Sequence, residues 1–314
     1  MLNITNGDSA VHVIRAAGIR GDYLPWRDLL HEGPVPAGLT LEELSDVRAR
    51  FIADCGWGDF NEVRSMFRER DGALRDFRKH ERTVLWFEHD LYDQTQLLQL
   101  LAWFADHDPS GADLRLICTD HYLGELSPDQ LASLADREIP VTGGMLDLAR
   151  RGWEAFTSAD PTDIERLIGE DTGALPFLAG ALIRHLEQFP SVANGLCRTE
   201  WQILEAVNSG AGTFGRVFAA TQRMEERVFM GDTMLWRYIE GLAGGPRPLL
   251  TVGERSGEAF SRAVAPTPVA AEVLAGVADW IALNGIDRWL GGAHLRAGSV
   301  YRWDAAARHL TLPE

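Results

Sequence analysis

The sequence predicts an α/β fold: a Rossmann-like, mostly parallel sheet with helices on both faces, followed by a helical connector and a smaller winged-helix-like domain. Short apolar runs alternate with helical segments over the first 144 residues. These runs are apolar at successive positions, as in parallel strands that are buried on both faces. Further along, three helical segments precede two short apolar runs that flank a polar turn. We therefore expect domains at residues 1–144 and 196–314, joined by a connector at 145–195.

The expected strands of the first domain are short apolar runs, namely Leu2–Thr5, Tyr23–Leu24, Val84–Phe87, Leu114–Cys118 and Ile139–Val141. The expected helices are Ala10–Ala17, a segment from Thr40 to about Cys55, Phe60–Arg78, Gln94–Ala105 and a segment that begins at Ser127–Pro128. Thr40 and Glu43 have the spacing of a capping box. Gly18 ends the first helix, and Pro128 stands at the first position of the last one, behind a hydroxyl cap.

The later part of the chain shows mainly helical signals. In the connector, helices open at Asp160–Pro161 and cover Leu175–Phe189. In the last domain, the expected elements are a helix capped by Thr199 and Gln202, a short helix capped by Thr213, a helix over Gly231–Leu242, and a hairpin of Leu249–Val252 and Ala263–Ala265. Three helices followed by a hairpin is the order of a winged helix. A plain helical interaction module has the same pattern and stays an alternative.

Composition excludes several classes of protein. No apolar run approaches the ~20 residues that span a bilayer, and the chain does not start with a signal peptide, so we expect a cytoplasmic protein without a membrane partner. Cys55, Cys118 and Cys197 are far apart in sequence, so neither a disulfide framework nor a thiolate zinc site is expected. The sequence leaves the oligomeric state open.

The net charge of −16 is unevenly distributed along the chain. Residues 190–314 carry 12 arginines and 13 carboxylates, so nearly all of the excess negative charge lies before them. Arginines also alternate with aromatic residues at 285–289 and 301–304. A nearly neutral domain lacks the basic surface of a typical nucleic-acid binder, so DNA binding by the last domain is an alternative that the charge does not favour.

The polar stretch Glu88–Gln94 is the best candidate for a functional site. It follows the expected strand Val84–Phe87, and ligands in open α/β sheets bind at the carboxyl ends of the strands. Asp90 is a natural cap for the next helix, and Asp93 and Gln94 would fall in its first turn. Capping does not explain Glu88 and His89. Buried charges are costly unless they are paired or coordinated, so these two residues point to a function.

Two other strand ends carry similar residues. Asn6, Gly7, Asp8 and Ser9 follow the first strand, where Asp8 or Ser9 could cap the helix or the helix start could bind a ligand. Ser9 as a nucleophile is disfavoured, because no base can be named for it and no Asp-x-x-His follows near the chain end. Asp120 occupies the equivalent position one strand after Glu88.

A loop stiffened by prolines carries a further group of ionisable residues, which includes Arg27, Asp28 and His31. The planar guanidinium of Arg27 suits a phosphate or a carboxylate if it turns inward, whereas an exposed Arg27–Asp28 pair would contribute little. His31 is a candidate acid/base or metal ligand, with a purely structural role as the main alternative.

These residues suggest a site for a small polar ligand, with a divalent metal as a candidate cofactor. Asp8, His89 and Asp90 are the candidate metal ligands, although a carboxylate–histidine network without metal would use the same residues. We expect hydrolysis or group transfer, with His89, His31, Asp8 and Glu88 as the catalytic candidates. The candidate ligand-binding residues are Asn6, Gly7, Ser9, Arg27, Asp28, Asp93, Gln94 and Asp120. A ligand-sensing transcriptional regulator or a protein-interaction adaptor is the alternative function. A P-loop nucleotidase or an ordinary dinucleotide-dependent dehydrogenase is disfavoured, because the first turn has neither glycine motif.

Three motifs in this order resemble a known family. They are Asn-Gly-Asp-Ser at 6–9, Leu-Pro-Trp-Arg-Asp with His-Glu-Gly-Pro at 24–34, and Trp-Phe-Glu-His-Asp-Leu-Tyr-Asp-Gln at 86–94. Together they resemble the bacterial domain-of-unknown-function family 1835 over roughly the first 125 residues. Leu175–Ile203 is similar to a region that accompanies this domain in some members. The resemblance implies a bacterial α/β domain without an assigned activity, and it carries over no catalytic residue.

Overall fold

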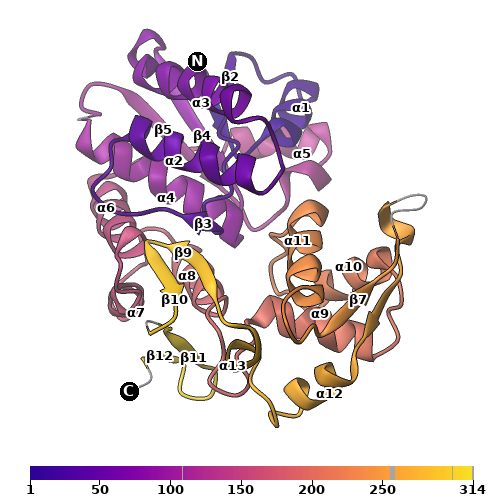
Figure 1. Cartoon of the computed structure of the whole chain (residues 1–314). Coiled ribbons are helices and arrows are strands. Elements are labelled where there is room, and N and C mark those ends of the chain that lie inside the picture. Colours follow the sequence, from indigo (N-terminus) through magenta and orange to yellow (C-terminus); the bar gives the residue numbers. More distant parts are fainter. Residues whose placement is uncertain (108, 255–258, 299, 313–314) are drawn as a thin grey trace. The chain divides into compact units, whose positions relative to one another are not determined.

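The structure of the chain is a computed structural model that describes residues 1–107, 109–254, 259–298 and 300–312. It divides into two units (Figure 1). Unit 1 consists of Met1–Leu182 together with Trp289–Ala293, and unit 2 consists of Ile183–Arg288 and His294–Glu314. Most of the expected connector, residues 145–182, therefore belongs to unit 1.

A mostly parallel five-stranded sheet forms the centre of unit 1. Its strands, in spatial order, are β2 (Asp22–Pro25), β1 (Leu2–Thr5), β4 (Arg82–Phe87), β5 (Asp113–Cys118) and β6 (Ile139–Pro140). The first four are parallel, and β6 pairs antiparallel with β5. The chain runs from β1 outward to β2 and then returns to place β4 on the other side of β1. The carboxyl ends of β1 and β4 therefore form the switch point at which such sheets bind ligands.

Helices cover both faces of this sheet. On one face, α1 (Asp8–Ala16) and α5 (Pro128–Ala135) bury Ile14 and Leu131 against Trp86 of β4. Because side chains alternate along a strand, Leu85 and Phe87 point to the other face, where α4 (Leu91–Asp106) packs. Helix α4 is buried along most of its length, since α6 (Gly143–Thr157) packs on its outer side. The other helices of unit 1 are α2 (Leu41–Asp54), α3 (Phe60–Arg75) and α7 (Thr162–Ile168), and α8 (Leu178–Leu186) crosses the boundary between the units.

A distant segment of the chain completes unit 1. Strand β3 (Gly33–Pro34) pairs with β9 (Asp287–Gly291) in parallel, with Gly33 opposite Leu290. The turn that follows β9 lies directly on α6: the amide of Gly292 donates to the carbonyl of Phe156 at 3.0 Å. A Cβ atom on Gly292 would lie 1.8 Å from the carbonyl oxygen of Thr157. Only glycine fits at that position.

Unit 2 contains the three expected helices and the expected hairpin, followed by helices and strands that the sequence did not predict. Its helices are α9 (Arg198–Asn208), α10 (Phe214–Gln222), α11 (Asp232–Ala243), α12 (Pro268–Leu274) and α13 (Trp280–Asn284). Its other elements are the antiparallel strands β7 (Leu250–Val252) and β8 (Val264–Pro266), the strand β10 (Ala293–Arg296), which begins in unit 1, and the antiparallel pair β11 (Arg302–Asp304) and β12 (His309–Thr311).

The capping box of α9 differs from the prediction. The helix begins at Arg198, so Cys197 and Glu200 form the box in place of Thr199 and Gln202. The Cys197 thiol accepts from the amide of Glu200, and the Glu200 carboxylate accepts from the amide of Cys197 at 2.8 Å. The Thr199 hydroxyl instead donates to Gln188 at 2.8 Å. The prediction was wrong because a thiol is an unusual cap.

In the first domain the prediction holds well. The expected strands and helices are all present, with small differences at their ends. The capping box of Thr40 with Glu43 is confirmed, and so is the hydroxyl cap of Ser127 with Pro128 in the first turn. Within the described residues, each helix is either too short or too polar to cross a bilayer.

Candidate functional site

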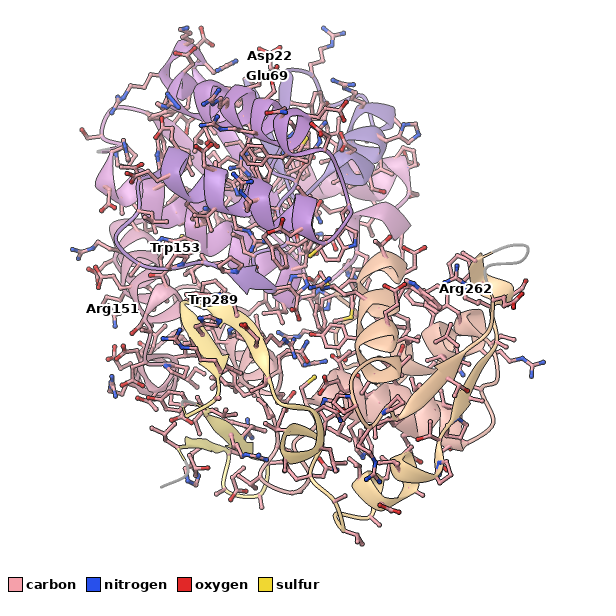
Figure 2. All side chains as sticks on the ribbon, viewed as in Figure 1. Asp22, Glu69, Arg151, Trp153, Arg262 and Trp289 are labelled. Atoms are coloured by element: carbon pink, nitrogen blue, oxygen red, sulfur yellow. The ribbon has the colours of Figure 1, made fainter. Side chains whose placement is uncertain are left out.

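The candidate site lies where β4 passes into α4, at the carboxyl edge of the sheet. Glu88, His89 and Asp90 form this junction, and Asp93 and Gln94 lie in the first turn of α4. All five side chains are buried. Asp22, labelled in Figure 2, begins β2 and therefore marks the opposite, amino-terminal edge of the sheet. Exposed acids such as Glu69 on α3 are ordinary surface residues by comparison.

Three of these residues bring their carboxylates together. One oxygen each from Glu88, Asp90 and Asp93 lies within 4.8 Å of the other two. Burial is the main reason why the pKa values of all three carboxyl groups are raised, and the neighbouring carboxylates raise them further in Asp90 and Asp93. The pKa of Asp90 rises to about 7, and that of Asp93 lies well above its ordinary value. The three groups thus resist full ionisation in the absence of added positive charge.

Hydrogen bonds fix the orientation of this carboxylate triad. The carboxylate of Asp93 accepts from the amide of Glu88 at 2.7 Å and from the side chain of Asn6 at 2.8 Å. Asp90 caps α4 by accepting from the amide of Asp93 at 3.1 Å. The carboxylate of Glu88 accepts from the amide of Leu123 at 2.8 Å. Backbone donors and one side-chain amide therefore hold the triad in place.

The end of β1 belongs to the same network. Besides the bond from Asn6 to Asp93, the Tyr92 hydroxyl donates to the carbonyl of Asn6 at 2.9 Å. Gly7 is the N-cap of α1, and α1 has no side-chain cap. The expectation that Asp8 or Ser9 caps this helix was wrong, because the helix already begins at Asp8. Both of these side chains are exposed, and the structure places neither of them in the triad.

Asp8 forms an ion pair with Arg27 instead. The Arg27 guanidinium donates to Asp8 through Nε at 2.7 Å and also through a terminal nitrogen, and this pairing lowers the pKa of Asp8. The side chains of Asp8 and Arg27 are 68% and 39% exposed, so the pair lies on the surface. Arg27 has a left-handed backbone with φ of 54°. The prediction of Asp8 as a metal ligand is therefore not supported by its position.

Asp28 has a structural role. Its carboxylate accepts from Arg48 at 2.9 Å, and both side chains are buried. Arg48 also donates to the carbonyls of Leu29 at 2.9 Å and Glu32 at 2.6 Å. This ion pair therefore fastens the proline-rich loop, and a role of Asp28 in ligand binding stays a prediction. A partner twenty residues away could not be read from the loop itself.

The two candidate histidines pack against aromatic rings. The His89 ring lies 5.2 Å from the ring of Tyr122 and 5.9 Å from that of Phe177. The His31 ring lies 5.9 Å from the ring of Tyr92, edge to face. Neither is part of the triad. Their predicted roles in acid/base chemistry stay predictions.

Gln94 lies next to the triad, whereas Asp120 lies outside it. The Gln94 amide donates to the carbonyl of Glu88 at 2.6 Å and to the Cys118 thiol at 3.4 Å. It therefore links the ends of β4 and β5 next to the triad. Burial raises the pKa of Cys118 to about 12, which keeps this thiol neutral. Asp120 is exposed beside His121 and does not join the triad. No sequence pattern pointed to the amide of Leu123, because any residue except proline can supply a backbone donor.

The triad is the group that could hold a metal ion. Among the described residues, Glu88, Asp90 and Asp93 are the set of acidic, histidine or cysteine side chains whose ligand atoms lie close enough together. The predicted set of Asp8, His89 and Asp90 therefore shares only Asp90 with it. Carboxylate oxygens suit hard cations such as Mg²⁺, Mn²⁺ and Ca²⁺ better than Zn²⁺, which prefers nitrogen and sulfur.

No family model matches the chain, and no curated protein matches it either.

Proposed function

We propose that unit 1 binds a divalent cation at Glu88, Asp90 and Asp93 and uses it in hydrolysis or group transfer on a small polar substrate. The observation that supports this proposal is the buried carboxylate triad, whose oxygens lie within 4.8 Å of one another. The triad lies at the switch point between β1 and β4, where open α/β sheets bind ligands.

The electrostatics of the triad favour a cation. The interactions that raise the pKa values of Asp90 and Asp93 are burial and the neighbouring carboxylates, and the opposing ones are hydrogen bonds. A divalent cation would supply the positive charge that lets all three groups ionise at neutral pH. The competing interpretation is a network of carboxyl groups that share protons and bind no metal.

Each residue of the site would have a distinct role in binding the cation or the substrate. Glu88, Asp90 and Asp93 hold the cation, and Asn6 and the amide of Leu123 orient two of them. A bound cation would polarise an oxygen of the substrate and stabilise negative charge that develops there. The polar surface at the end of β1 would then orient the substrate. His89 remains a candidate for proton transfer, since it stands between two ligands in the sequence.

Calorimetric titration of Mg²⁺ and Mn²⁺ into the chelator-treated full chain tests the proposal. Asp90→Asn is the informative variant, because asparagine also caps helices and the change removes charge with little loss of structure. Asp59→Asn is the matched control, since Asp59 caps α3 and takes part in none of the triad's bonds. We expect one site per chain, lost in Asp90→Asn and Glu88→Gln and kept in Asp59→Asn. Absence of binding to the unaltered chain contradicts the proposal.

A second candidate function rests on unit 2. We infer that α9 to α11 with β7 and β8 form a winged-helix-like module, as in a regulator or adaptor. The order of the elements supports this, and so does an antiparallel bridge between Thr213, which precedes α10, and Ala263, next to β8. Such a short strand between the first two helices, paired with the hairpin, fits a winged helix.

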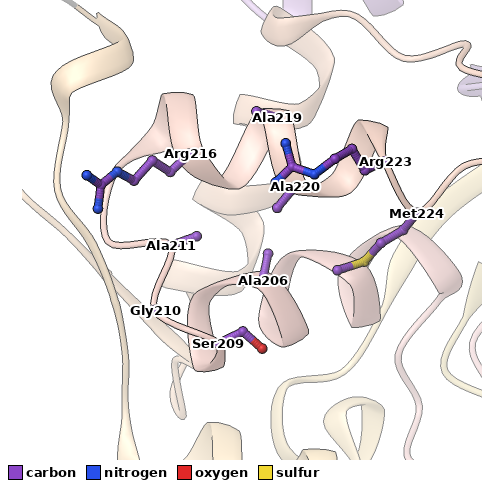
Figure 3. A pocket seen from close by; sticks show the side chains of 9 residues that line it. All are labelled: Ala206, Ser209, Gly210, Ala211, Arg216, Ala219, Ala220, Arg223 and Met224. Carbon is purple, nitrogen blue, oxygen red and sulfur yellow. The ribbon is translucent and has the colours of Figure 1, made fainter.

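The surface of this module offers one further observation. A groove of about 620 Å³ lies between the end of α9 and α10, and Figure 3 shows Arg216 and Arg223 along it with Ala219 and Ala220 between them. Fluorescence anisotropy with labelled duplex DNA tests the regulator. Binding that weakens with salt and is lost in Arg216→Gln/Arg223→Gln supports a nucleic-acid partner. Absence of binding at low salt favours the adaptor.

The resemblance to the domain-of-unknown-function family 1835 stays a prediction. The resemblance is supported by the site, because two of the three motifs contain residues that form it. Asn6 comes from the first motif, and the triad comes from the third.

A further inference from the structure

A second cavity, inside unit 2, has aromatic walls. It has a volume of about 490 Å³ and lies between the start of α9, the segment at residues 187–197, the end of α12 and the β11–β12 turn. Phe189, Trp201 and Trp303 are among the residues that line it. Its volume falls within the range of small-molecule sites, roughly 300–1,000 Å³.

The two tryptophans of the lining differ in their exposure to water. Trp303 is buried, and its backbone is fixed by bonds to Pro190 at 2.8 Å and Val192 at 3.0 Å, so it forms a rigid wall. Trp201, an equally large side chain, is 44% exposed. Its ring forms part of the wall and still reaches water, so it can contact a ligand that enters the cavity.

Two arginines and three carboxylates beside the cavity are paired with one another. Arg198, the basic residue in the lining, donates to Glu187 at 2.7 Å and to Glu226 at 2.6 Å, and it lies 3.9 Å from Glu225. Arg184 in turn pairs with Glu225 at 2.7 Å. Two guanidinium groups thus face three carboxylates. An anionic ligand would meet an arginine that is already neutralised.

The neutral polar side chains of the lining are also occupied. The Asn194 side chain accepts from the Ser191 hydroxyl at 2.8 Å and donates to the carbonyl of Val273 at 3.1 Å. The Gln202 amide donates to the carbonyl of Met224 at 3.4 Å. A ligand would therefore be recognised through the aromatic rings and the net negative charge.

We propose that this cavity binds a small organic cation, such as a quaternary or protonated amine, against Trp201 and Trp303, with the excess of carboxylates over guanidinium groups beside the cavity as countercharge. Faces of tryptophan rings attract such cations strongly, and carboxylates nearby add to the attraction. The proposal is independent of the carboxylate triad in unit 1. It gives unit 2 a ligand site of its own.

Choline and 3,3-dimethyl-1-butanol, its uncharged isostere, distinguish the cation from a merely apolar ligand. Each is titrated into the full chain while the indole N–H signals are followed by NMR. We expect saturable binding of choline that shifts the Trp201 signal, with an affinity about fivefold or more above that of the alcohol. Equal affinity for the two probes, or no saturable shift with choline, overturns the proposal.

Three variants check the role of the ring. Trp201→Leu keeps an apolar side chain and should lose the preference for choline, whereas Trp201→Phe should keep part of it. Phe260→Leu is the matched control, because Phe260 is also 44% exposed and does not line the cavity. Its preference should equal that of the unaltered chain. A preference that survives Trp201→Leu contradicts the proposal.

Discussion

The side-chain amide of Asn6 donates a hydrogen bond of 2.8 Å to the carboxylate of Asp93. This bond joins the end of β1 to the first turn of α4, across 87 positions of the sequence. It spans the switch point of the sheet and holds one member of the carboxylate triad in place. The geometry of the site therefore depends on a contact between the end of β1 and the start of α4, which are neighbours only in the folded chain.

Replacement of Asn6 tests this contact. Asn6→Ala leaves the buried carboxylate of Asp93 without one donor, so the free energy of unfolding should fall by about 1–3 kcal/mol. Urea denaturation in the presence of a chelator measures the change. Excess Mg²⁺ should recover part of the loss, because a bound cation replaces the missing donor. A variant as stable as the unaltered chain would show that the bond contributes little.

The raised pKa of Asp90 predicts how stability changes with pH. The folded chain keeps the Asp90 proton up to about pH 7, whereas the unfolded chain releases it near its ordinary value. The folded state therefore binds more protons in this range. The free energy of unfolding contributed by this group should fall as pH rises from about 4 to about 7.

Urea denaturation across this pH range, in chelator, measures that contribution. The fall should be smaller in Asp90→Asn, which cannot titrate, and unchanged in Asp59→Asn. Mg²⁺ should flatten the fall in the unaltered chain, since it favours the ionised triad. Identical pH profiles for the unaltered chain and Asp90→Asn contradict the assignment.

The Asp28–Arg48 ion pair should matter for stability and not for cation binding. Asp28→Ala leaves Arg48 buried without its carboxylate, which should cost about 3–5 kcal/mol in the free energy of unfolding. Asp46→Ala is the control. It breaks a more exposed pair with Arg64 and should change stability little. Calorimetry of the folded Asp28→Ala variant should give unchanged Mg²⁺ affinity, and a tenfold loss would place Asp28 back in the site.

Two of the three thiols should be unreactive in the folded chain. Burial raises the pKa values of Cys118 and Cys197 to about 12, so almost no thiolate is present at pH 8. Brief treatment with iodoacetamide, followed by peptide mass spectrometry, should find both unmodified. The same treatment in urea should modify them. Fast labelling of Cys118 in the folded chain would contradict its raised pKa.

The sequence predicts the elements of the site better than its internal contacts. The apolar run Val84–Phe87 indicates a buried strand, and Asp90 at its end indicates a helix cap, since both signals are local. The grouping of Glu88 with Asp93 depends on how the first turn of α4 orients its side chains. The contribution of Asn6 depends on which strand lies beside β4.

Long-range partners explain the other differences. The ion pair of Asp28 could not be read from the loop, because its partner Arg48 lies on the helix α2. Trp289–Ala293 joins unit 1 because β9 pairs with β3, and strands of two to five residues give little sequence signal. The exposed pair of Asp8 and Arg27 and the isolated position of Asp120 likewise follow from the fold and not from residue type.

Crystals of the full chain soaked in Mn²⁺, with data collected at a wavelength where manganese scatters anomalously, show whether the triad holds a cation. We expect an anomalous peak about 2.0–2.3 Å from oxygens of Glu88, Asp90 and Asp93, absent from crystals of Asp90→Asn. A triad with no peak, in crystals that show manganese elsewhere on the chain, would contradict the proposed cation site.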